Sequence, residues 1–406
     1  MSLWIPPPKP PTKLGVYRRL STMAGVHVSP LQLGAASIGD KWNDMLGSMD
    51  KESSLKLLDA YYDAGGNFID TANSYQDEAS EKFIGEWAEA RGIRDQLFIA
   101  TKYTSNYKRG NDSVTQQILY TGNNHKSLHI SVKASLEKLR TTYIDLLYLH
   151  WWDFETSIEE VMRSLHALVL SGKVLYLGVS DTPAWVVSQA NQYAKDHALT
   201  PFVIYQGAWN VMDRDFEREI IPMARSQGMA LAPWNAVAGG KFRTDAEEER
   251  RRTTGEQGRQ LGPTWERNEK EKKVSAALEK VAKEVGTNQV TAVALAYLLH
   301  KAPFVFPIIG GRKVEHLLGN IEALDISLSE EQMKELESAV EFDLGFPSVM
   351  IVNFLYLMPL HTGILKAYQG TGTNHGFLMA SAAHLEPPLV LQPHRQSKGN
   401  SFVHYE

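Results

Sequence analysis

Eight short apolar runs recur along this chain, and most of them start roughly 30 residues apart, the length of one strand plus one helix. Between the runs, apolar residues recur at helical spacing, as over 128–139 and 158–168. Strands that alternate with helices are expected to be parallel, because a parallel pair needs a long crossover. The runs are Leu31–Ala36, Asn67–Asp70, Leu97–Thr101, Ile144–Leu149, Val174–Val179, Phe202–Gln206, Gly228–Pro233 and Phe304–Ile309.

Eight strand–helix repeats predict a (β/α)8 TIM barrel, and 406 residues suit one such domain with additions. The runs are continuously apolar, as expected of strands that are covered on both faces. We expect an extended, proline-rich lead-in over 1–16 and the barrel over 17–347. The segment Tyr17–Val28 is predicted to be an N-terminal hairpin that closes the barrel floor. Residues 348–406 show no further repeat and are predicted to be a non-barrel extension, partly ordered at best.

Composition and charge argue against several classes of binding partner. The formal net charge is −5, which gives no basic field for nucleic acid. There is no cysteine, so disulfides and thiolate metal sites are excluded. The N-terminus lacks the pattern of a signal peptide, and the longest apolar stretch, Met350–Leu360, is too short to span a bilayer. These features predict a cytoplasmic protein without a membrane partner, and leave monomer and dimer open.

Two interruptions between the repeats are longer than the others. Residues 103–126 follow the third run, and residues 241–273, which contain the charged stretch 245–252, follow the seventh. Both are predicted to be solvated surface loops. Because they emerge on the same end of the barrel, a role as lids stays open.

No metal site is predicted. Five of the 13 histidines lie beyond Pro347, but their separations are longer than those of metal-binding motifs.

Polar residues follow three neighbouring runs. Asp70, Lys102 and His150 lie at the carboxyl ends of the second, third and fourth, and Tyr75 follows Asp70 by five residues. Active sites of barrels are built at that rim. An ammonium beside a phenol stabilises the phenolate and lowers the phenol pKa, so Tyr75 could serve as a general acid toward a carbonyl oxygen. The imidazole could donate a hydrogen bond to that oxygen. None of these groups supplies a hydride, so a reduction needs a cofactor.

Each of these residues also has an ordinary structural explanation. Asp70 could cap the following helix, Lys102 could lie at the surface, and His150 could be a buried, hydrogen-bonded histidine. Their joint placement at one rim favours an enzyme.

An anion site is predicted after the eighth run. Gly310 and Gly311 end the strand, and Arg312 and Lys313 open a predicted helix over 314–323. Free amides at a helix start and two cations suit a phosphate. Phosphate sites of barrels commonly follow the seventh and eighth strands.

Residues from about 17 to 347 resemble the aldo-keto reductases, in particular the fungal aryl-alcohol dehydrogenase and norsolorinic acid reductase-like branch. The segments that carry the resemblance are Asn67–Tyr75, Phe98–Lys102, Ile144–Asp153, Gly172–Asp181 and Ile308–Lys313. The resemblance implies an NADP-dependent oxidoreductase of secondary metabolism with the catalytic residues Asp70, Tyr75, Lys102 and His150. It implies no Rossmann domain.

The resemblance also implies which residues hold NADPH. Ser180 and Gln206 match positions that bind the nicotinamide carboxamide, and Asp181 stands where many relatives have asparagine. Trp234 matches the aromatic residue that stacks on the nicotinamide. Asn235, Val237 and Gly239 match the turn at the pyrophosphate. Arg312, His316 and Asn320, beside Gly310, Gly311 and Lys313, match the adenosine 2′-phosphate end.

The substrate is the least transferable feature, because the 59 residues after Pro347 depart from the ending expected for this branch. Trp151, Trp152, Tyr103 and Tyr107 could line an aromatic substrate pocket or pack a loop. We expect an aryl or polyketide-derived aldehyde or ketone. Two alternatives stay open: a non-catalytic, NADPH-binding regulatory barrel, and a Schiff-base lyase that uses Lys102.

Overall fold

The computed structural model describes residues 7–42, 49–256 and 264–348. Its eight parallel strands are paired in the order β10-β3-β4-β5-β6-β7-β8-β9. A bridge between Leu231 and Val305 links the two ends of this order and closes the barrel. The (β/α)8 prediction is therefore confirmed. The strands are β3 (Gln32–Gly34), β4 (Phe68–Asp70), β5 (Phe98–Tyr103), β6 (Ile144–Leu149), β7 (Val174–Ser180), β8 (Ile204–Ala208), β9 (Ala230–Trp234) and β10 (Ile308–Ile309).

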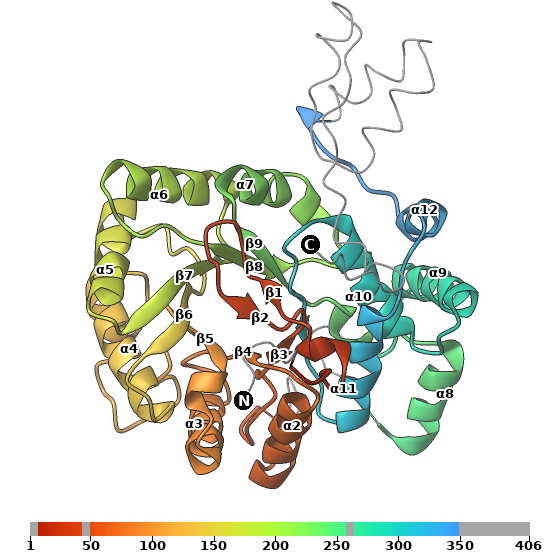
Figure 1. The fold of residues 1–406 in the computed structure, drawn as a ribbon, viewed down its shortest axis with the longest axis horizontal. Coiled ribbons are helices and arrows are strands. Elements are labelled where there is room, and N and C mark those ends of the chain that lie inside the picture. Colours follow the sequence, from red (N-terminus) through yellow and green to blue (C-terminus); the bar gives the residue numbers. More distant parts are fainter. Residues whose placement is uncertain (1–6, 43–48, 257–263, 349–406) are drawn as a thin grey trace, which may run out of the picture.

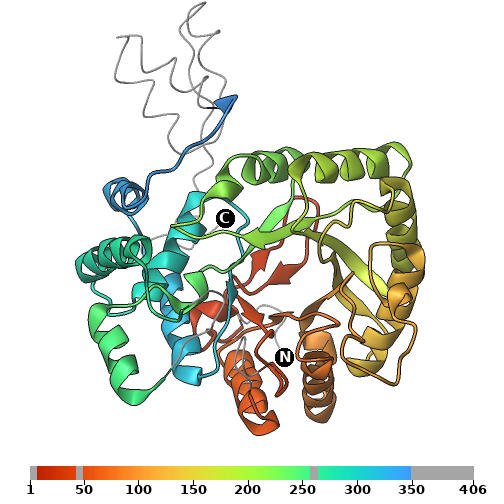
Figure 2. The same ribbon diagram turned by 180° about the vertical axis from the view of Figure 1, so that it is seen from behind.

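Helices surround the strands, and the N-terminal hairpin lies across one end of the barrel (Figures 1 and 2). Every predicted run overlaps a strand, although β10 keeps only the last two residues of its run. The helices are α2 (Lys51–Asp63), α3 (Ala79–Arg91), α4 (His125–Lys138), α5 (Ile158–Leu170), α6 (Ala184–Asp196), α7 (Ile220–Gln227), α8 (Asp245–Thr254), α9 (Glu269–Val285), α10 (Val290–Lys301), α11 (Val314–Ile321) and α12 (Glu330–Ser338). None of the helices in the described part of the chain is both long and apolar enough to cross a membrane.

The expected hairpin forms and closes the floor. Its strands β1 (Arg18–Arg19) and β2 (His27–Val28) are antiparallel. Leu20, Ala24 and Val28 join a buried cluster with four aromatic side chains of the barrel, Phe68, Phe98, Tyr148 and Phe306. The ring of Phe68 lies 5.0 Å from Phe98 and 6.3 Å from Phe306, centroid to centroid. The floor is therefore a packed apolar layer that belongs to the inside of the barrel.

The two-residue period of the strands separates an inner core from an outer core. Phe68, Phe98 and Tyr148 belong to the inner cluster, whereas their neighbours Ile69 and Ile99 pack in the outer cluster with the helices. Further along the strands, the same period places polar side chains in the inner series: Asp70 and His150 lie two residues after Phe68 and Tyr148, and Lys102 lies four residues after Phe98. The catalytic candidates on β4, β5 and just after β6 are thus held above an apolar floor.

Serine side chains cap the starts of two helices. Ser329 and Gln332 form a complete capping box at the start of α12. Ser157 caps α5 by accepting from the Glu160 amide, but the Glu160 carboxylate accepts from the amide of His125 instead. This second contact ties α5 to α4.

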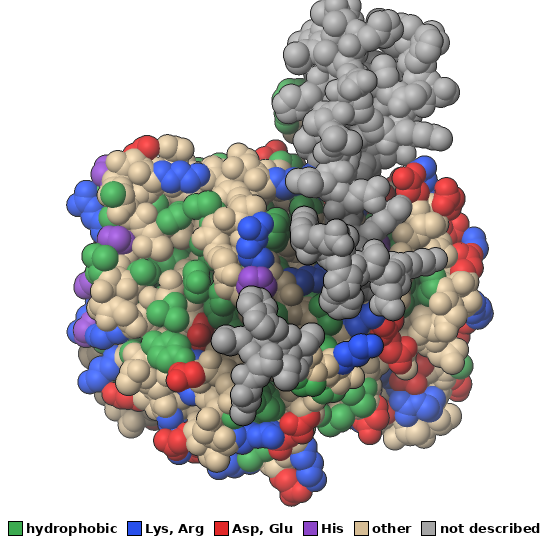
Figure 3. Space-filling model, in the orientation of Figure 1, with side chains coloured by type: hydrophobic (Ala, Val, Ile, Leu, Met, Phe, Trp, Pro, Cys, Tyr) green, Lys and Arg blue, Asp and Glu red, His purple; other side chains and the backbone are tan. Residues whose placement is uncertain are grey.

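The charged stretch 245–252 is not a loop, as the sequence suggested, but most of α8. Thr244 caps this helix, and Glu248 is buried between Arg243 and Arg267. Burial alone would raise the pKa of Glu248, but the two guanidinium groups outweigh it and hold the pKa at about 2. The glutamates and the arginines that follow them also form ion pairs at spacings of three and four residues along the helix. On the face shown in Figure 3, acidic and basic side chains are interspersed.

The predicted domain boundaries, at residues 16/17 and 347/348, lie near the two ends of the described chain and stay a prediction. A short 3-10 helix, Lys13–Gly15, lies within the lead-in, and its Leu14 is fully buried. The expected extension lies outside the described residues from 349 onward.

Helix packing at Gly85 gives a stability prediction. A Cβ atom at this position of α3 would lie 2.3 Å from the main-chain oxygen of Lys138 at the end of α4. We expect Gly85→Ala to lower the free energy of unfolding by about 1–3 kcal/mol, because main chain cannot move aside cheaply. Gly25→Ala is the control, since its Cβ would meet nothing within 4 Å. Denaturant unfolding measures both, and equal stabilities would contradict the packing argument.

Candidate active site

A buried ion pair lies at the centre of the barrel mouth. Asp70 ends β4 and Lys102 lies near the end of β5, so the parallel register brings them together. The Lys102 Nζ donates to both Asp70 carboxylate oxygens, at 2.8 and 2.7 Å, and to the Thr71 main-chain oxygen at 2.7 Å. Lys102 is fully buried and Asp70 nearly so. Burial lowers the pKa of Lys102, but Asp70 and Tyr75 reverse this effect and raise it overall, which keeps the ammonium charged.

Asp70 has a third partner, which fixes its orientation. The Gln206 side-chain amide, on β8, donates to Asp70 Oδ1 at 2.8 Å. The carboxylate is thus held from opposite walls of the barrel by Lys102 and Gln206. Its position does not depend on any loop.

Tyr75 lies beside this pair, in the turn that follows β4. The Lys102 Nζ is 5.0 Å from the centroid of the Tyr75 ring. Burial raises the pKa of the phenol, and although Lys102 lowers it, the net shift is upward. This outcome differs from the expected lowering, because burial outweighs the ammonium. The phenol is therefore protonated at neutral pH and can donate its proton.

His150 completes the group directly after β6. Its ring centroid lies 5.9 Å from that of Tyr75, nearly edge to face. Burial and the charge of Lys102 lower the pKa of His150 to about 3, so its imidazole is neutral. Its Nδ1 is 3.4 Å from Ser105 Oγ. A neutral imidazole can orient a carbonyl oxygen by a hydrogen bond without competing as an acid.

The opposite wall of the mouth carries another part of the predicted set. Ser180 ends β7, and Asp181 follows it with a left-handed φ of 42°. The Trp234 indole, at the end of β9, donates to Asp181 Oδ1 at 3.1 Å and is 38% exposed. This bond holds an accessible aromatic face at the rim.

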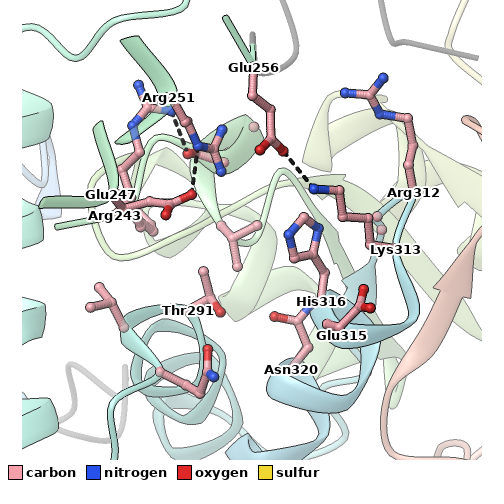
Figure 4. A pocket seen from close by; sticks show the side chains of 18 of the residues that line it. Arg243, Glu247, Arg251, Glu256, Thr291, Arg312, Lys313, Glu315, His316 and Asn320 are labelled. Atoms are coloured by element: carbon pink, nitrogen blue, oxygen red, sulfur yellow. Dashed lines mark hydrogen bonds and ion pairs between the residues drawn. The ribbon is translucent and has the colours of Figure 1, made fainter. Parts of the chain in front are cut away.

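A groove of about 850 Å³ lies beside the mouth, between the turn after β9 and the start of α11. Nine residues of the predicted cofactor set line it, and Figure 4 shows several of them. They are Asn235, Val237, Gly239, Gly310, Gly311, Arg312, Lys313, His316 and Asn320. The other predicted residues, Ser180, Asp181, Gln206 and Trp234, belong to the barrel mouth.

The cations of this groove differ in their pairing. Glu256, just after α8, accepts from Lys313 at 3.0 Å and from Arg250 at 3.1 Å. Arg312 forms no ion pair with any residue in the described ranges, and its side chain extends away from the Lys313–Glu256 contact in Figure 4. Burial and Lys313 lower the pKa of the neighbouring His316. Arg312 is therefore the cation of this group that is ready to receive an anion.

The four aromatic candidates for a substrate pocket lie in different surroundings. Tyr103 and Tyr107 are buried, and their hydroxyls donate to the main-chain oxygens of Asn123 and Ile130. Trp152 is half-buried against the outer core. Trp151 is 37% exposed, and its indole donates to Ser105, the partner of His150. Of the four, Trp151 is the one that combines accessibility with a link to the catalytic group.

Sequence reasoning missed Trp42 and the turn that follows Tyr75. Trp42 precedes α2, and its ring lies edge-on to that of Tyr75, with 6.1 Å between the centroids. Gln76, in the turn, forms hydrogen bonds with the main chain of Ala36 and Lys41, in the loop that carries Trp42. No motif signals either contact, because both depend on how two loops meet.

The closed parallel barrel thus carries an acid, a phenol, an ammonium and an imidazole at one rim. The sequence matches the aldo/keto reductase family over residues 30–341, and the chain belongs to this family.

Several fungal proteins are similar over most of the chain. An aryl-alcohol dehydrogenase [NADP(+)] of Phanerodontia chrysosporium is 62% identical, over 86% of this chain and 92% of that protein. A norsolorinic acid reductase of Aspergillus flavus is 52% identical, over 87% of each chain. The aldo-keto reductase ausK of Emericella nidulans is 51% identical, over 94% of this chain and 95% of that protein. The expected resemblance to this branch is confirmed.

The low pKa of His150 predicts a pH dependence of stability. The folded-state pKa is about 3, against 6.5 for an unperturbed histidine, so between these values the unfolded chain binds more protons. The unfolding free energy should therefore fall as the pH drops below about 6.5. In His150→Gln this contribution should disappear, which denaturant unfolding from pH 4 to 7 measures. An imidazole NMR signal that is absent from His150→Gln but titrates near pH 6.5 in the wild type would contradict the assignment.

Proposed function

We propose that this chain is an NADPH-dependent reductase of aldehydes or ketones that also works in reverse, with Tyr75 as the general acid. The observation that carries the proposal is the buried Lys102–Asp70 pair beneath the Tyr75 phenol. A bound, oriented ammonium next to a protonated phenol suits proton donation to a carbonyl oxygen that is gaining negative charge.

The described residues fit a phosphorylated dinucleotide. The groove has a glycine-lined wall at Gly310 and Gly311, a helix start at α11 and Arg312, which forms no ion pair within the described part of the chain. Such a combination binds a terminal phosphate. The groove shares the turn after β9 with the barrel mouth, where Trp234 offers an aromatic face. When bound, NADPH would supply the hydride for the carbonyl carbon.

The chain's own residues supply the proton and the orientation. Tyr75 donates its hydroxyl proton to the carbonyl oxygen, and Lys102 stabilises the charge left on the phenolate. Asp70, held by Gln206, keeps Lys102 in place. The neutral His150 donates a hydrogen bond to the same oxygen and so orients the carbonyl group.

We propose an aryl or polyketide-derived carbonyl compound as the substrate. The names of two relatives, an aryl-alcohol dehydrogenase and a norsolorinic acid reductase, support this class. Trp151 and Trp42 offer aromatic surface beside His150 and Tyr75. A cytoplasmic location is part of this proposal.

The contacts of Lys102 disfavour the Schiff-base alternative. A nucleophilic lysine must be neutral, whereas the pKa of Lys102 is raised and its ammonium donates to three oxygens. The regulatory alternative differs in predicting NADPH binding without turnover.

Tyr75→Phe tests the proposed acid. It removes the hydroxyl and keeps the ring, so we expect kcat for aryl aldehyde reduction to fall by about 10²-fold or more. The Kd for NADPH should stay near the wild-type value, because Tyr75 does not line the groove. Steady-state kinetics and fluorescence titration measure the two quantities. Near wild-type turnover in Tyr75→Phe would remove Tyr75 from the role, and NADPH binding without turnover by the wild type would favour the regulatory barrel.

Arg312→Ala tests the phosphate end of the groove. We expect the Kd for NADPH to rise by about tenfold or more, the scale of a charge-assisted contact, and that for NADH to change little. Lys313→Ala is the matched control and should weaken NADPH less, because Glu256 already pairs with Lys313. Equal losses for NADPH and NADH in Arg312→Ala would reject the assignment to the 2′-phosphate.

A further inference from the structure

Directly after Tyr75, three consecutive residues have left-handed backbones. Gln76, Asp77 and Glu78 have φ values of 53°, 51° and 77°, and none of them is glycine. The left-handed region costs free energy for any residue with a side chain. A run of three such residues persists only when their side chains are held by their surroundings.

Gln76 ties this turn to the loop that follows β3. Its side chain is fully buried, and its amide donates to the Ala36 main-chain oxygen at 2.9 Å. Its Oε1 accepts from the amides of Lys41, at 2.9 Å, and Trp42, at 2.8 Å. Gly39 lets the two segments meet, since a Cβ atom there would lie 2.4 Å from the Gln76 Cβ. One side chain thus spans residues 36–42 and fixes that loop against the turn.

Asp77 fixes the side chain that this loop carries. Its Oδ1 accepts from the Trp42 indole nitrogen at 2.9 Å. The Trp42 ring is held edge-on to Tyr75, with an angle of 71° between the planes. The backbone of Trp42 is bound by Gln76 and its ring by Asp77.

Glu78 holds the other end of the turn. Its carboxylate pairs with Lys108, in the loop after β5, at 2.5 Å and with Lys138 of α4 at 3.2 Å. The turn therefore cannot relax without breaking contacts on both sides of Tyr75.

We propose that Gln76 and Asp77 are positioning residues that hold Trp42 as an aromatic wall beside the Tyr75 phenol, and that this wall gives the enzyme its preference for aryl carbonyl substrates. The proposal rests on the reductase function proposed above. An aromatic ring whose carbonyl oxygen reaches Tyr75 lies beside Trp42, whereas a short aliphatic chain has no ring to pack there. The strained turn holds the Trp42 ring at a fixed position relative to the Tyr75 hydroxyl.

The experiment compares Asp77→Ala with Asp77→Asn, using benzaldehyde and butanal as substrates with NADPH. Asp77→Asn keeps an oxygen acceptor for the indole, and Asp77→Ala removes it. In Asp77→Ala we expect KM for benzaldehyde to rise by about three- to tenfold, the effect of one aromatic contact, with kcat within twofold. KM for butanal and the Kd for NADPH should stay within twofold, and Asp77→Asn should resemble the wild type.

Trp42→Phe and the double variant Trp42→Phe/Asp77→Ala link the effect to this one hydrogen bond. Phenylalanine cannot donate to Asp77, so adding Asp77→Ala to Trp42→Phe should cause no further loss toward benzaldehyde. Additive losses would overturn the proposal, as would equal losses toward benzaldehyde and butanal or an unchanged Asp77→Ala enzyme. If the wild type reduces neither aldehyde with NADPH, the proposed function has failed instead.

Discussion

The buried contact between Lys102 and Asp70 is the interaction on which the catalytic mouth depends. A lysine without exposure would be driven toward its neutral form, and the carboxylate reverses this tendency. Asp70 is in turn held by Gln206 from across the barrel. The charge under the phenol is therefore anchored in strands, the most rigid part of the fold. Loops contribute Tyr75 and the aromatic surface around it.

Much of the fold could be predicted because it follows from periodic patterns. Continuous apolar runs and helical spacing identified the eight strands, and parallel strands place Asp70, Lys102 and His150 at one rim. The shortness of β10 was not predictable. Its run Phe304–Ile309 is apolar throughout, but only Ile308 and Ile309 pair with β3 as a strand. The helix over the charged stretch 245–252 was missed because charge spacing does not reveal that Glu248 is buried between Arg243, five residues before it, and Arg267, nineteen residues after it.

The candidate site was predictable in its residues but only partly in its electrostatics. Motifs name Tyr75 and Lys102, but the pKa of Tyr75 depends on how far burial outweighs the ammonium, which only packing decides. Arg312 and Lys313 look alike in sequence, yet of these two cations only Lys313 pairs with Glu256 within the described residues. Trp42 and Gln76 belong to two loops that meet in space, and no spacing rule connects them.

The hairpin across the floor has a consequence for the order of events. With that end filled by Leu20, Val28 and the phenylalanines, the four polar side chains can be reached from the rim alone. Two ligands that enter through the same open end of the barrel cannot pass each other inside it. If one of two ligands binds deeper in this opening than the other, the deeper one must bind first and leave last, so a closed barrel floor would set an order of binding and release.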